Sequence, residues 1–337
     1  MSLSEQFTEP ASGVTGNCQE RSMQVLLGAA VVATGFMLTP MFQPSVRPLA
    51  YALWTVLGGV IVLAGWRRAS VRPRAAGGLE QRALAAIRQL DEDAAESRLQ
   101  AVRALAEIAD MWAPGRQACI DALCAYLRRP SRGTDVEHRV RKTAIRLIGA
   151  HLRTDAESPW HGCDLNLAGA VIDGGCFAGA DFSSGVVDFS GARFVGDSVL
   201  FSQARFTGAT VRFTRAHFAA DKVDFGGAEF GGGSRVDFSN ARVDAGTLDF
   251  SYCRLSRSSM SFDAAQFVDG LVDFYGARLD RSKVSFSGAS FGATLFRLSH
   301  LLLTHAEVSF LDTRPAPEAL DLTGVKGTIS FGGPVST

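Results

Sequence analysis

The sequence predicts a multi-domain chain with three structured parts: a two-helix transmembrane hairpin, an α-helical neck and a C-terminal β-solenoid. Three observations lead to this prediction. Two long uncharged stretches lie between residues 23 and 66, apolar residues recur at helical spacing between 79 and 153, and phenylalanine recurs at every twelfth position from residue 189. With 337 residues, the chain is long enough for several domains.

The transmembrane hairpin is predicted over 23–66, where the uncharged stretches 23–42 and 49–66 flank the turn QPSVRP. At about 1.5 Å per residue, each helix would be about 27–30 Å long, close to the thickness of the bilayer core. Arginines crowd the basic linker 67–78, whereas the turn holds Arg47 alone. The positive-inside rule then predicts a multi-pass plasma-membrane protein with both termini in the cytoplasm, and 1–22 as a disordered cytoplasmic tail.

The helical neck is predicted over 79–153. Leu99, Val102, Leu105 and Ile108 recur every third residue, which favours an amphipathic helix. Three similar segments, separated by short loops, complete a small antiparallel array of four helices.

The solenoid is predicted from residues that recur every twelve positions. A small residue, usually alanine, stands two positions before every second phenylalanine, and a valine commonly stands two positions before the others. Alternating apolar pairs between small turn residues indicate short strands, and a fixed period over about ten copies indicates stacked β-coils. We expect the following phenylalanines to form the buried core ladder: Phe189, Phe194, Phe201, Phe206, Phe213, Phe218, Phe225 and Phe230.

The repeat resembles the pentapeptide-repeat family, because AGADF at 178–182 fits that family's five-residue motif. The resemblance covers about 160–311 and implies a right-handed quadrilateral β-helix. The later units have twelve residues, so two values stay open for the number of residues per coil: about 20 or about 24. Two apolar spans, a helical segment and the opening at Trp160 are also similar to a membrane-anchored subgroup from actinobacteria. Residues 312–337 lose the repeat, and we expect them to form a C-terminal cap or tail through which a homodimer would form.

The outward-facing position after the small residue of each unit is most often basic. This predicted surface stripe consists of Arg193, Arg205, Arg242, Arg254 and Arg278. A second outward row, which includes Asp188, Asp224 and Asp249, is mostly acidic. Two interpretations stay open: a solvated surface with weak ion pairs, or a stripe that recognises a partner of patterned charge.

Charge and motifs exclude several classes of function. Formal net charge is zero; residues 67–159 carry +5 (17 − 12) and residues 160–337 carry −4 (15 − 19), which is too little to indicate nucleic-acid binding. The six cysteines form no CxxC pair, so we expect free thiols. No nucleophile triad, phosphate loop or metal motif occurs in the sequence, so no catalytic, cofactor-binding or metal-binding residue is predicted.

These observations predict a membrane-anchored, non-catalytic scaffold or protein-binding module at the cytoplasmic face, with an unidentified protein partner. The alternative, suggested by the resemblance, is an acidic-duplex mimic that inhibits a DNA topoisomerase. Such a mimic needs a strongly negative stripe, and the arginine row weakens that interpretation.

Overall fold

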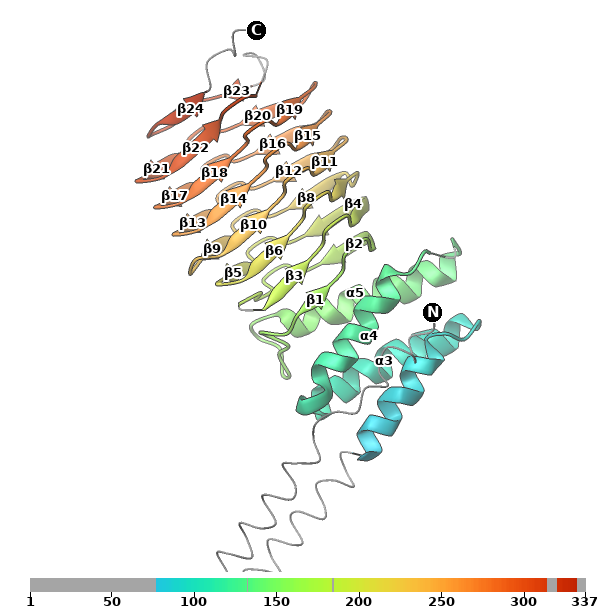
Figure 1. Ribbon diagram of the computed structural model, residues 1–337. Coiled ribbons are helices and arrows are strands. Elements are labelled where there is room, and N and C mark those ends of the chain that lie inside the picture. Colours follow the sequence, from blue (N-terminus) through green and yellow to red (C-terminus); the bar gives the residue numbers. More distant parts are fainter. Residues whose placement is uncertain (1–76, 132, 184, 314–319, 332–337) are drawn as a thin grey trace, which may run out of the picture. The chain divides into compact units, whose positions relative to one another are not determined.

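The computed structural model describes residues 77–131, 133–183, 185–313 and 320–331. The chain divides into two compact units, Met1–Ala85 and Ala86–Thr337, which we describe separately. In the first unit, residues 77–85 are described and are helical. The second unit holds a helical part and the solenoid (Figure 1).

The predicted transmembrane hairpin is not supported. Among the residues that the structure describes, no helix is both long enough and apolar enough to span a bilayer. The predicted spans at 23–66, together with the tail 1–22 and most of the linker 67–78, lie outside those residues. The predicted multi-pass plasma-membrane localisation depended on these spans, so it is not supported either.

Short parallel strands form the solenoid and lie in four rows along its axis (Figure 1). The first row is an eight-stranded sheet and the fourth row is a five-stranded sheet. The second and third rows belong to one eleven-stranded sheet, because the long strand β4 (Arg193–Leu200) takes part in both. The beginning of β4 pairs with β7 (His217–Phe218) in the second row, and its end pairs with β8 (Lys222–Asp224) in the third row. A parallel solenoid of about seven turns with four rows is compatible with the four-sided β-helix that the resemblance implies.

The strands of each row follow one another from coil to coil. The first row contains β1 (Leu165–Asn166), β3 (Val186–Asp188), β6 (Thr210–Arg212), β10 (Arg235–Asp237), β14 (Ser259–Ser261), β18 (Lys283–Ser285), β22 (Glu307–Phe310) and β24 (Ile329–Phe331). The second row contains β7, β11 (Arg242–Val243), β15 (Gln266–Phe267) and β19 (Ser290–Phe291). The third row contains β8, β12 (Thr247–Asp249), β16 (Leu271–Asp273), β20 (Leu295–Arg297) and β23 (Leu320–Asp321). The fourth row contains β5 (Arg205–Thr207), β9 (Glu229–Gly231), β13 (Arg254–Ser256), β17 (Arg278–Asp280) and β21 (Leu302–Thr304), while β2 (Val171–Cys176) pairs with β4.

Strand register gives the size of the coil. Val236 pairs with Met260, which pairs with Val284, so successive rungs are 24 residues apart (260 − 236 and 284 − 260). Two twelve-residue units therefore make one coil in this part of the solenoid. The first and last coils are shorter, because Leu165 pairs with Val187 across 22 residues (187 − 165) and Val308 pairs with Ile329 across 21 (329 − 308). Val211 pairs with Val236 across 25 residues (236 − 211), because the corner at 231–233 holds the extra glycine.

The core consists of columns of stacked phenylalanine rings. The Phe213 ring stacks on Phe189 and Phe238, with centroid distances of 5.1 and 4.6 Å. Phe225, twelve residues away, belongs to another column and meets Phe213 edge-on at 5.8 Å. All eight residues of the predicted ladder are buried. Each such ring contributes about 1.5–3 kcal/mol by burial, so this core is the main stabilising feature of the solenoid.

Aspartates at strand ends fix many of the corners. The backbone N–H of Ser251 donates to Asp249 at 2.8 Å, and that of Tyr275 donates to Asp273 at 2.8 Å. This local bond to an N–H two residues later stabilises a turn. Much of the acidic row seen in the sequence therefore has a structural role.

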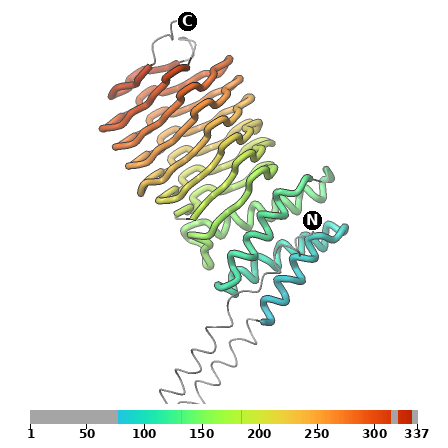
Figure 2. Tube along the Cα trace, in the orientation of Figure 1, coloured from blue at the N-terminus to red at the C-terminus, as the bar shows by residue number. Residues whose placement is uncertain are grey.

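Helices precede the first coil, where the neck was expected. Their bounds are α3 (Ala95–Met111), the short 3₁₀ helix η3 (Ala113–Gly115), α4 (Arg116–Arg128) and α5 (Asp135–Leu152), and residues 77–89 are also helical. Within the second unit, α4 contacts β1 and α5 contacts β2. The backbone N–H of Asp181 donates to the carbonyl of Leu152 at 2.7 Å. Helices α4 and α5 therefore act as a cap on the first coil, and Figure 2 shows the successive coils continuing from α5.

Trp160 joins the cap to the solenoid. Its fully buried ring stacks on His151 at a centroid distance of 4.2 Å. Asp110 accepts a hydrogen bond from the Trp160 indole at 3.0 Å, and its other oxygen lies 3.1 Å from His151 Nε2. The sequence element that opens the coils thus anchors α5 and α3 to them.

The solenoid continues into the stretch expected to be a cap or tail. Ile329 of β24 pairs with Val308 of β22, and Phe331 stacks on Phe310 at 5.5 Å. Residues 320–331 therefore extend the sheets, although their sequence has lost the twelve-residue period.

A cationic groove as the candidate functional site

The structure divides the predicted arginine stripe between two rows. Arg193 and Arg242 lie in the second row, and Arg205, Arg254 and Arg278 lie in the fourth. The division follows from the 24-residue coil, since neighbouring twelve-residue units occupy different sides.

The fourth-row arginines share an acidic neighbour. The carboxylate of Glu229 lies 3.9 Å from Arg205 and 3.6 Å from Arg254, and these side chains are about half exposed. Exposed ion pairs of this kind typically contribute under about 1 kcal/mol. This geometry favours the interpretation as a solvated surface over a recognition stripe.

Carboxylates on neighbouring rungs of the third row also have nearby cations. Lys222 Nζ lies 2.8 Å from Asp249 and 3.3 Å from Asp224. Arg297 donates to Asp273 through Nε at 3.0 Å and forms a second ion pair with its other oxygen. Like charges brought together by the stacking are thus offset by opposite charges here.

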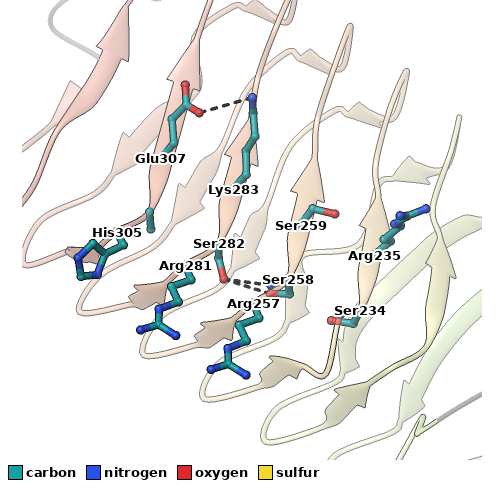
Figure 3. Close-up of a pocket in the computed structure, with 12 residues that line it drawn as sticks. Ser234, Arg235, Arg257, Ser258, Ser259, Arg281, Ser282, Lys283, His305 and Glu307 are labelled. Carbon is teal, nitrogen blue, oxygen red and sulfur yellow. Dashed lines mark hydrogen bonds and ion pairs between the residues drawn. The ribbon is translucent and has the colours of Figure 1, made fainter.

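A groove of about 610 Å³ follows the corner between the fourth and first rows, over four successive rungs. Figure 3 shows its side chains rising from neighbouring coils. We call it the cationic groove, after the basic residues that line it: Arg235, Arg257, Arg281, Lys283 and His305. Glu307 is the acidic residue in its lining, so the groove carries a formal charge of +3 with His305 neutral (4 − 1).

Backbone hydrogen bonds place the groove's arginines on adjacent rungs. The N–H of Arg257 donates to the carbonyl of Asp280 at 3.0 Å, and that of Arg281 donates to Thr304 at 2.9 Å. Rungs joined in this way are about 4.8 Å apart. The two arginines therefore start from neighbouring points on one corner, and both side chains are exposed.

This corner requires a left-handed backbone, which glycine adopts most easily. The φ angles of Arg257, Arg281 and His305 are +50°, +47° and +50°, and Gly233 has φ +81° one coil earlier. A side chain in this region costs about 1–2 kcal/mol relative to glycine. The sequence thus places cations where the turn alone would favour glycine.

Most cations of the groove lack a carboxylate partner. Lys283 lies 3.5 Å from Glu307. Arg235, Arg257 and Arg281 take part in none of the ion pairs found among the described residues. Figure 3 shows the guanidinium groups of Arg257 and Arg281 side by side at the corner, with nothing acidic drawn between them. The groove is therefore equipped to hold an external anion.

Sequence reasoning missed the groove because its period is 24 residues, not twelve. The Arg-Ser pairs at 257–258 and 281–282 recur at that spacing. A comparison of alternate units would have revealed them. Their serines line the floor: Ser258 N–H donates to Ser282 Oγ at 3.2 Å, and Ser282 Oγ donates to the Asp280 carbonyl at 2.8 Å.

A second cavity, of about 340 Å³, lies beside α5 and β2. Its basic side chains already have partners inside the protein: Lys142 Nζ lies 3.9 Å from Asp173, which His138 also contacts, and the Arg141 guanidinium donates to backbone carbonyls. It therefore offers a less suitable anion site than the groove.

Among the cysteines that the structure describes, Cys119 and Cys124 are buried and Cys176 is exposed. Burial raises the pKa of Cys119 to about 11 and that of Cys124 to about 12, so both thiols are protonated at neutral pH. No set of three or more His, Cys, Asp or Glu side chains within the described ranges is arranged to hold a metal ion.

Comparison with known proteins identifies no relative: the chain matches no family model, no curated protein and no solved structure. The β-solenoid is compatible with the pentapeptide-repeat fold, and the membrane-anchored subgroup has no support.

Proposed function

We propose that the protein is a non-catalytic binding module whose solenoid holds a protein partner at the cationic groove. The observation that carries this proposal is the run of arginines on consecutive rungs without ion-pair partners among the described residues. The stacked core supports it, because a rigid corner presents these side chains at fixed intervals.

The topoisomerase-mimic alternative has less support from the surface. A duplex mimic needs rows of unneutralised carboxylates. Asp249 and Asp273 instead bond to turn N–H groups and face Lys222 and Arg297.

A site-specific photocrosslinker tests the docking surface. The crosslinking amino acid replaces Ser259, an exposed residue that lines the groove, or Ser290, an exposed residue of the second row. We expect one discrete protein adduct in cells from position 259 and none from position 290. Identical adducts from both positions, or no adduct from position 259, would contradict the proposal.

A further inference from the structure

We propose that the groove recognises an acidic peptide segment in extended conformation, in which at least two Asp or Glu side chains point the same way. This inference rests on the proposed function and specifies the chemistry of the partner.

The first argument is charge. Like charges directly opposite each other on neighbouring strands are destabilising. In the third row, Lys222 and Arg297 offset the neighbouring aspartates, but Arg257 and Arg281 have no such counterpart among the described residues. A bound carboxylate would supply the missing counter-charge, and a guanidinium can hold it through two parallel hydrogen bonds.

The second argument is spacing. Arg257 and Arg281 lie on adjacent rungs at the corner. Arg235 lies one rung earlier on the neighbouring strand β10, where it pairs with Ser259, so the three arginines span about 10 Å along the axis. An extended peptide places side chains of one face about 6.7 Å apart, so two acidic side chains in a Glu-x-Glu pattern fall within this span. The long, exposed arginine side chains can adjust to the difference between the peptide spacing and the rung spacing. Ser259, an exposed residue of the groove, would hydrogen-bond to the peptide backbone.

The third argument is scale, which favours a peptide over a nucleic acid. Binding to nucleic acid depends on many phosphate contacts and on an extended basic surface. The groove offers four formal cations, one of which is paired with Glu307, in a chain whose formal net charge is zero.

The left-handed corner permits a test that leaves the fold intact. Asparagine tolerates this backbone region, so Arg257→Asn with Arg281→Asn removes two charges without new strain. Arg215→Asn is the matched control, because Arg215 is an exposed arginine with φ +58° at another corner. Far-UV circular dichroism and urea midpoints verify the fold of each full-length variant.

The probe is a fluorescein-labelled peptide with alternating Glu and Ser, titrated by anisotropy at low salt beside its Gln counterpart. We expect the wild-type chain to bind the Glu peptide at least about tenfold tighter than the Gln peptide, and the double variant to lose about tenfold or more. Arg215→Asn should stay within about twofold of wild type, because the effect is local.

Three results would overturn the inference: no preference for Glu over Gln in the wild type, equal losses in the double variant and the control, or tighter binding of an oligothymidylate of equal charge. The last result would point to nucleic acid. A protein crosslinked at position 259 without affinity for the acidic peptide would leave the proposed function standing and refute this inference alone.

Discussion

Replacement of Phe238 by alanine tests the stacked core most directly. The ring is fully buried and stacks on Phe213 and Phe262, both at centroid distances of 4.6 Å. It also meets Phe225 and Phe250 edge-on, at 6.0 and 5.8 Å. Truncation of a buried phenylalanine to alanine costs about 3–5 kcal/mol through lost transfer energy and the cavity that remains. A fifth aromatic contact is the tilted one with Phe218, at 6.0 Å. Because this site loses all five aromatic contacts, we expect the upper half of that range, about 4–5 kcal/mol.

The matched control is Phe238→Leu, since Leu298 already takes the place of a phenylalanine in a neighbouring column and is 1% exposed. We expect this variant to lose only about 1–2 kcal/mol, because most of the apolar volume remains. Stability in a solenoid is close to a sum of rung and neighbour contributions, so hydrogen exchange should report the loss first in the adjoining coils. Urea unfolding of the full chain gives the total. A loss below about 1 kcal/mol for alanine, or equal losses for both variants, would refute the reasoning.

Three further predictions address the groove, the charged rows and the corners. Glu307→Gln should free Lys283 and raise acidic-peptide affinity about two- to fivefold in the anisotropy titration, and unchanged affinity would contradict this charge balance. Burial alone would raise the pKa of Asp249, but hydrogen bonds from Lys222 and Ser251 bring this pKa below its usual value. The resulting stabilisation is present above about pH 4 and is lost as pH falls through the lowered pKa. The urea midpoint of Asp249→Asn should therefore depend less on pH between about pH 4 and 2 than that of the wild type, and an equal pH dependence would argue against this role. Gly270→Ala should destabilise by on the order of 2–3 kcal/mol in urea unfolding, because its Cβ would lie 2.2 Å from a backbone oxygen at φ +92°, and a loss below about 1 kcal/mol would count against the clash.

The core of the solenoid was predictable because burial leaves a period in the sequence. Phe189, Phe201 and Phe213 share one environment, so their spacing identified a β-coil. That spacing could not reveal that Phe189 and Phe213 stack on each other while Phe201 meets both edge-on, because either arrangement buries every ring. Coil size depends on hydrogen-bond register, which became visible only with the strand pairing.

The surface was less predictable, because exposed positions leave no such period in the sequence. Exposed side chains are not constrained by packing, so a row such as Arg193 and Arg205 looked continuous while its members lie on different sides. The groove was missed because Arg257 and Arg281 differ from the residues of the intervening units. The prediction of membrane spans used hydropathy alone and found no support in the described helices.

The pairing of two units per coil also constrains how such a chain can change length. Loss or duplication of a single twelve-residue unit would move every later side chain by half a turn, so that first-row residues would enter the third row. The core would tolerate this shift, because both halves supply phenylalanine, but Arg257 and Arg281 would leave the corner that now holds them. Length variants that keep one continuous surface should therefore differ by 24 residues, as insertions or deletions of whole coils.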